Sequence, residues 1–146
     1  MPNKKNYKIE IIDDVASADF IFKATAESIS ELFEACAYAS MLAITDPESV
    51  DARKFIDIEV SASDLNELLY NFISEIIYLK DTEKMFFSKF DVIIDEAECK
   101  MIARVGGETI DFARHIIKTD VKAVTFHELD IKKSKNEFNV KMILDL

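Results

Sequence analysis

An apolar stripe of helical period constrains the fold more than any other feature of the sequence. Apolar side chains recur three or four positions apart at Leu65, Leu68, Leu69, Phe72, Ile73, Ile76 and Ile77. A stripe of this kind covers one face of an amphipathic helix, and Ser63 or Asp64 can cap its start. Because full burial of one Leu or Ile is worth roughly 1.5–3 kcal/mol, we expect this helix to be the central core element.

The other elements are also long, since only two glycines and two prolines interrupt 146 residues. A second helix is predicted between the capping box that starts at Ser28 and the stop at Thr45-Asp46-Pro47. Residues Gly106–Lys118 read as a polar loop. Strand patterns occupy Tyr7–Ile12, Phe20–Ala24, Phe55–Val60, Phe86–Ile94, Cys99–Val105, Val121–Ile131 and Phe138–Leu144.

The order of these elements, ββαβαββββ, predicts an α+β fold. We expect two helices packed on one side of a largely antiparallel sheet. The last two strand segments should form a hairpin across residues 133–136. A chain of this length typically forms one domain, here residues 1–146.

The charge balance limits the partners. With 28 acidic and 18 basic residues, the formal net charge is −10. Such a surface repels phosphate and lacks the basic stripe typical of nucleic-acid-binding proteins, so no direct nucleic-acid binding is expected. A basic partner protein, a cation or solubility alone would each account for the acidity.

The sequence predicts a cytoplasmic location. The polar N-terminus carries no signal-peptide pattern, and the longest uncharged run, residues 35–45, is about half of what a membrane span requires. Two cysteines, Cys36 and Cys99, are too few for a disulfide framework or a Cys-rich zinc site.

Motifs that carry enzyme chemistry are missing from the sequence. It contains no phosphate-binding GxxxxGK[ST] or GxGxxG, no GxSxG and no HExxH. His115 and His127 are the only histidines, and a histidine hydrogen-bonded at a sheet edge is the simpler account of His127. A small hydrolase that uses His127 with an acidic partner remains an alternative, which requires the imidazole to face into a pocket.

Acidic residues near the two ends of the chain suggest a cation site. Asp13, Asp14 and Asp19 crowd one short turn, and the sequence closes on Asp145 and Leu146. Carboxylate and main-chain oxygens are the ligands that Ca²⁺ and Mg²⁺ prefer. A solvated acidic turn is the alternative, and no EF-hand loop of the DxDxDG type is present.

Several long stretches resemble the archease family. The helix pattern LLYxWLxELLYLxDTE and the segment GExxD…H…KTEVKAxTYH of that family have counterparts here. In order along the chain, the matching residues are Leu68–Leu79, Asp81–Glu83, Gly107–Asp111, His115, Lys118–His127 and Met142–Leu146. Thr45-Asp46 also closes the first helix as it does in the family.

The resemblance implies an auxiliary protein of an RtcB-type RNA ligase, which joins tRNA halves and repairs RNA. Archeases are not ligases; they promote guanylylation of the ligase and its multiple turnover, and they bind a divalent ion through carboxylates near the chain ends. The family's HTAD motif falls on residues 16–19, so the expected metal ligands are Asp19, Asp145 and Leu146, for Ca²⁺ or Mg²⁺. Asp46 is expected to contribute to the partner-binding tip.

This sequence departs from the family pattern at four positions. Val15 replaces an acid, Ala16 the histidine, Ser17 the threonine and Ala26 a glycine. Asp19 retains the carboxylate, whereas Ala16 can neither ligate a metal nor donate a proton. A general chaperone or assembly module without metal dependence is therefore the main alternative function.

Overall fold

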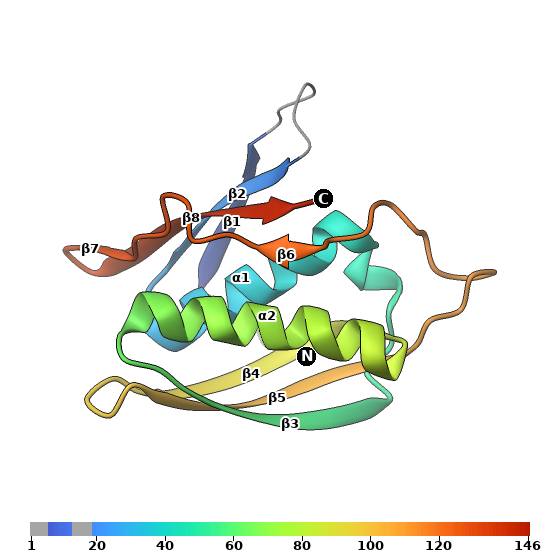
Figure 1. The fold of residues 1–146 in the computed structure, drawn as a ribbon, viewed down its shortest axis with the longest axis horizontal. Helices are drawn as coiled ribbons and strands as arrows, with labels where there is room; N and C mark the ends of the chain where they lie inside the picture. The colour runs from blue at the N-terminus through green and yellow to red at the C-terminus, as the bar shows by residue number, and fades with distance from the viewer. Residues whose placement is uncertain (1–5, 13–18) are drawn as a thin grey trace.

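The computed structural model describes residues 6–12 and 19–146 in eight strands, two α-helices and one short 3-10 helix (Figure 1). The helices are α1 (Ile29–Ile44), η1 (Pro47–Ser49) and α2 (Leu65–Glu83). The strands are β1 (Tyr7–Ile12), β2 (Asp19–Ala26), β3 (Lys54–Ser61), β4 (Met85–Asp95), β5 (Lys100–Thr109), β6 (Ala123–Val124), β7 (Lys132–Ser134) and β8 (Glu137–Asp145).

The strands form two antiparallel sheets. One sheet has the order β1-β2-β8-β6, with β7 also paired to β8, and the other has the order β3-β5-β4. Both helices contact strands of both sheets, and Figure 1 shows them in the layer between. The predicted α+β class is confirmed and the element order broadly so, with two short strands, β6 and β7, where one was expected. The division of the strands into two sheets gives each helix an apolar neighbour on two sides.

The apolar stripe of α2 is buried as expected. Its side chains Leu68, Leu69, Phe72, Ile73 and Ile76 are almost completely inaccessible to solvent. The Asp64 carboxylate accepts a hydrogen bond from the Glu67 amide at 2.8 Å and so caps the helix start. Among the described residues, no helix is long and apolar enough to cross a membrane.

Helix α1 is more deeply buried than α2. Ser28 caps the helix as predicted: its Oγ accepts from the Glu31 amide at 3.1 Å, and the Glu31 carboxylate reaches back and accepts from the Ser28 hydroxyl at 2.9 Å. Four positions along the helix carry Ala or Cys with no exposed surface, at Ala35, Cys36, Ala37 and Ala39. These small side chains let both sheets approach the helix closely.

The expected loop after residue 105 begins later than predicted, because β5 continues through Gly106 and Gly107 to Thr109. A side chain at Gly107 would place its Cβ 1.9 Å from the Phe86 carbonyl oxygen. The register of β4 against β5 also shifts between Phe87 and Lys89. Gly107 therefore allows a close backbone approach within a strand, and neither glycine marks a turn.

The expected long strand over residues 121–131 is wrong. Only β6 and β7 pair with β8 there, and a turn at His127 and Glu128 separates them. Glu128 has the left-handed backbone conformation, with φ of 57°. The alternation of apolar side chains in this stretch reflects Val121, Val124 and Leu129 packing into the core from an irregular segment.

Candidate metal centre

Two of the predicted ligands lie at neighbouring strand ends. Asp19 is the first residue of β2 and Asp145 is the last residue of β8. The antiparallel register places Asp19 directly opposite Asp145. Asp19 is half-buried, Asp145 is exposed, and Leu146 follows with its side chain packed against the core. The fold thus joins residues that are 126 positions apart in the sequence.

The hydrogen bonds between β8 and the segment that contains β6 show whether Asp19 and Asp145 are a hydrogen-bonded or a non-hydrogen-bonded pair. The main-chain oxygens of Ile143 and Asp145 accept from the amides of Thr125 and Lys122, at 3.1 and 2.8 Å. In an antiparallel sheet, a residue that bonds to one neighbouring strand is not hydrogen-bonded to the other. Asp19 and Asp145 are therefore a non-hydrogen-bonded pair, with Cα atoms about 4.5 Å apart and side chains on one face.

That face is the outer face of the sheet. The alternate residues of β8, Met142 and Leu144, are fully buried, and so is Phe22 of β2. The carboxylates of Asp19 and Asp145 therefore emerge on the side away from the helices. Like charges directly opposite each other are unfavourable by roughly 0.2–1 kcal/mol, and a cation between them would reverse the sign of this interaction.

The donor set suits a hard divalent cation. Two carboxylates on one face, with the main-chain oxygens of Leu146 beside them, are oxygen ligands of the kind that Ca²⁺ and Mg²⁺ take, the rest being water. In residues 6–12 and 19–146, no group of three or more His, Cys, Asp or Glu side chains is gathered in metal-binding geometry. Asp13, Asp14, Ala16 and Ser17 lie outside the described residues.

The connecting segment, residues 110–122, frames this end of the molecule. The Lys118 amide donates to the Ile44 carbonyl at the end of α1, at 2.8 Å, and the Lys122 amide donates to Asp145. The Cα atoms of residues 118 and 122 can be at most roughly 14 Å apart. The connecting segment thus ties the end of α1, where Asp46 follows, to the strand end that carries Asp145.

The connecting segment also completes the C-terminus of α1. The Lys118 ammonium donates to the Leu42 carbonyl at 3.2 Å, and the buried Thr45 hydroxyl donates to the Ile116 carbonyl at 2.6 Å. Helix α1 has no basic residue in its own last turn. Lys118 therefore supplies the positive charge that a helix C-terminus favours.

Helix α2 holds the connecting segment from another side through Lys80. This lysine is buried, and its ammonium contacts the carboxylates of Asp120 and Asp81, each at 2.7 Å. Burial alone would lower the pKa of Lys80, but the hydrogen bonds and charges of the two aspartates raise it above its ordinary value. The lysine therefore stays charged and anchors Asp120.

A buried carboxylate, Glu108, fixes the start of the connecting segment. Its oxygens accept from the Asp51 amide at 2.7 Å and from His115 Nε2 at 3.0 Å, and they form an ion pair with Arg114. The Asp111 amide donates to His115 Nδ1 at 2.9 Å, so the ring proton is on Nε2. The His115 side chain is completely enclosed, and its ring makes a T-shaped contact with Phe86.

These contacts hold Glu108 in its charged form. The Arg114 guanidinium, opposed by burial and helped by the Asp51 amide and His115, lowers the pKa of Glu108 to about 2. The donors that satisfy this carboxylate belong to the protein itself. We therefore interpret the cluster of Glu108, Arg114 and His115 as a structural clamp on the connecting segment.

Sequence reasoning missed this clamp because it assigned residues 106–118 to a loop. The signal was present, since Glu108, Asp111 and His115 lie in the stretch that carries the family resemblance. Their spacing alone gives no helical or strand period, so only the fold reveals that β5 and the connecting segment bring the Glu108 and His115 side chains and the Asp111 amide together.

The two remaining candidates lie elsewhere. Asp46 caps η1, accepting from the Glu48 amide at 3.2 Å, and its side chain is half-buried. His127 is exposed in the turn between β6 and β7. The hydrolase alternative requires the His127 imidazole to face inward, and its exposed position in this turn argues against that function.

Comparison with known proteins identifies curated relatives across most of the chain. Protein archease of Sulfurisphaera tokodaii is 32% identical over 130 residues, covering 89% of this chain and 94% of the relative. Protein archease of Pyrococcus furiosus is 36% identical over 119 residues, covering 80% of this chain and 84% of the relative.

Solved structures share the fold. The solution structure of protein 1598 of Methanobacterium thermoautotrophicum matches with a TM-score of 0.80 and 32% identity, over 94% of this chain and 98% of that one. An archease of Thermotoga maritima, described as a possible chaperone, matches with a TM-score of 0.63 and 13% identity, over 88% and 91% of the two chains. The model of the Archease protein family matches residues 10–146, and the chain belongs to this family.

Proposed function

We propose that the protein is an accessory factor of an RtcB-type RNA ligase, promoting guanylylation and multiple turnover of that enzyme without catalysing a reaction itself. The observation that supports this most directly is the pairing of Asp19 with Asp145 on the outer face of the sheet. The resemblance to archeases implies a divalent ion bound by carboxylates near the chain ends, and this pair of aspartates is suited to that role. In this proposal the protein binds the ligase, and only the ligase binds RNA.

Asp19, Asp145 and Leu146 are the proposed ligands of one Ca²⁺ or Mg²⁺. A bound divalent ion would neutralise the two facing carboxylates and make the end of the molecule rigid. The Lys122 amide, at one end of the connecting segment, donates to the main chain of Asp145. The clamp at Glu108 holds the other end of that segment and would therefore help to position the site without contacting the ion. The substitutions at residues 15–17 leave both described carboxylates in place.

Asp46 is proposed to contact the partner beside this site. It follows α1 directly, and the connecting segment links that helix end to Asp145. The net charge of −10 would steer the protein toward the basic surface that an RNA-handling enzyme presents. Asp46→Asn should therefore lower the affinity for the partner and make binding less dependent on salt. The free energy of unfolding should change little.

The test is stimulation of the RtcB-type ligase from the same cells by purified protein. Asp19→Ala should abolish the stimulation of ligase guanylylation while the circular dichroism spectrum and melting temperature stay close to those of the parent. Glu59→Gln is the matched control, because Glu59 is an exposed carboxylate on the outer face of the other sheet. Normal stimulation by Asp19→Ala would refute the proposed site.

A general chaperone or assembly module is the second candidate function. Three large apolar side chains of the connecting segment favour it, since Phe112, Ile116 and Ile117 are 79%, 56% and 48% exposed. Exposed apolar surface of this kind often marks a protein-interaction site. Suppression of aggregation of an unrelated unfolded protein that is equal with Ca²⁺ and with EDTA, and lost in Phe112→Ser, would support this function over the ligase one.

A further inference from the structure

The outer face of the first sheet carries a second like-charged pair. Lys23 of β2 lies directly opposite Lys141 of β8, four residues along each strand from the two aspartates. By the same alternation of hydrogen bonds this is a non-hydrogen-bonded pair, so the two lysines extend from one face with Cα atoms about 4.5 Å apart. Four residues of strand separate the two pairs by about 13 Å.

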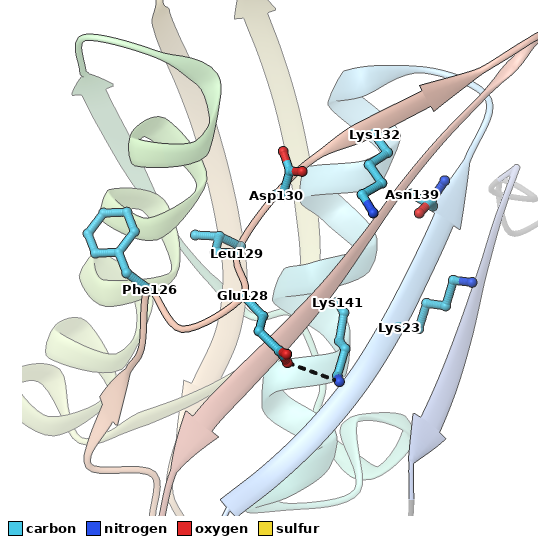
Figure 2. A pocket seen from close by; sticks show the side chains of 8 residues that line it. All are labelled: Lys23, Phe126, Glu128, Leu129, Asp130, Lys132, Asn139 and Lys141. Atoms are coloured by element: carbon cyan, nitrogen blue, oxygen red, sulfur yellow. Dashed lines mark hydrogen bonds and ion pairs between the residues drawn. The ribbon is translucent and has the colours of Figure 1, made fainter.

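A groove of about 570 Å³ lies beside the lysine pair (Figure 2). It forms where the segment between β6 and β7 leaves β8. Val124 pairs with Leu144 and Lys132 pairs with Asn139, so seven residues of that segment oppose four residues of β8. The extra length bends away from the strand, and the main-chain groups of Lys141 are directed toward this side.

Basic and amide groups gather in the groove. Lys23, Lys141 and Lys132 line it together with Asn139. Figure 2 shows the ends of the Lys132 and Asn139 side chains directed toward each other across paired strands. In a protein with a net charge of −10, three lysines that line one hollow provide local positive charge for an anion.

Two acidic residues share the lining and limit what fits. Glu128 forms an ion pair with Lys141 at 3.2 Å, and both side chains are about half exposed. Asp130 lies at the far end. An ion pair this exposed is worth about 0–1 kcal/mol, so an incoming anion of higher charge can replace the carboxylate.

We propose that this groove binds the phosphate groups of a compact phosphorylated ligand, such as a nucleotide or pyrophosphate. Lysine binds phosphate as a point charge, and a tetrahedral anion accepts from several donors at once. Lys23 and Lys141 would take one phosphate between them, which removes their mutual repulsion, while Lys132 and Asn139 would donate to a neighbouring one. Glu128, Asp130 and the net charge disfavour a long polyanion.

The test is calorimetric titration with inorganic pyrophosphate. Lys141→Gln should lower the affinity about tenfold, as expected for the loss of one charge-assisted contact. Glu128→Gln should raise the affinity, because it removes the competing carboxylate and keeps the side-chain shape. Lys89→Gln, an exposed lysine on the other sheet, is the control and should leave the affinity unchanged.

Titrations with GTP and with a 5′-phosphorylated oligoribonucleotide identify the source of the phosphate. We expect GTP to bind at least as tightly as pyrophosphate and the oligonucleotide to bind more weakly. No saturable binding of pyrophosphate, or equal affinities in the parent and in Lys141→Gln, would overturn the proposal. Tighter binding of the oligonucleotide than of GTP would overturn the assignment to a compact ligand.

Discussion

Glu108 and the Asp19–Asp145 pair represent two opposite ways of placing carboxylates in one small fold. Glu108 is buried, and amide, imidazole and guanidinium donors of the same chain surround it. Asp19 and Asp145 instead face each other at the end of a sheet, each the nearest strand neighbour of the other. The first arrangement is a closed network of charge and hydrogen bonds, whereas the second sets two like charges side by side on an outer face, where one cation can reach both.

This difference distinguishes a carboxylate that stabilises the fold from carboxylates that are available to a ligand. A carboxylate that the protein's own donors satisfy contributes to folding and gains nothing from a cation. Two carboxylates directly opposite each other repel, and a cation bound between them would be attracted by both. The family stretch around Glu108 and His115 therefore belongs to the scaffold, and the two strand ends belong to the proposed site.

The largest expected effect comes from breaking the clamp. Glu108→Gln removes the charge that Arg114 and His115 contact and should lower the free energy of unfolding by about 3 kcal/mol. For a chain of this size that corresponds to a fall of roughly 6–12 °C in melting temperature. Differential scanning calorimetry measures it.

The exposed pair of Asp57 and Arg104 provides the matched control for that measurement. Asp57→Asn breaks a bidentate contact on the outer face of the second sheet. Both side chains are largely exposed, so the melting temperature should hardly change. A fall as small for Glu108→Gln as for Asp57→Asn would contradict a structural role for Glu108.

The pH dependence of stability should report the same clamp. The pKa of Glu108 is lowered to about 2 in the folded protein from an ordinary 4.5. Its contribution is therefore complete above pH 4.5 and is lost as the pH falls toward 2. Urea midpoints at pH 7, 4, 3 and 2 should show the gap between the parent and Glu108→Gln narrowing over that range, and a constant gap would refute it.

The smallest effect has the opposite sign. Without divalent ions, Asp145→Asn should stabilise the protein by roughly 0.2–1 kcal/mol, because it removes one of two facing negative charges. Chemical denaturation in EDTA measures this change. If Asp145→Asn were destabilising in EDTA, the two carboxylates would not repel each other in the folded protein.

The sequence predicted the parts of the fold that depend on periodic patterns. The α2 stripe, the capping box of α1 and the first strand all lie where expected. The irregular stretches were not predictable in this way. Val121, Val124 and Leu129 alternate like a strand, yet a turn at Glu128 interrupts it, and Gly107 allows close packing inside β5 where a loop was expected.

The candidate site was predictable only in part. The resemblance singled out Asp19 and Asp145, but no local pattern predicts which strands are neighbours, so only the register of β2 against β8 shows that they meet. The clamp and the lysine groove depend on contacts between distant elements, and neither has a periodic pattern in the sequence.

Calorimetric titration of the metal-free protein with Ca²⁺ and with Mg²⁺ is the decisive experiment for the proposed metal site. We expect one binding site per chain, lost in both Asp19→Asn and Asp145→Asn and retained in Glu59→Gln. Ca²⁺ at about 100 times its dissociation constant should also add about 2.7 kcal/mol to the stability of the parent protein. Binding that survives in either aspartate variant, or no binding of either ion by the parent, would show that Asp19 and Asp145 do not form a metal site.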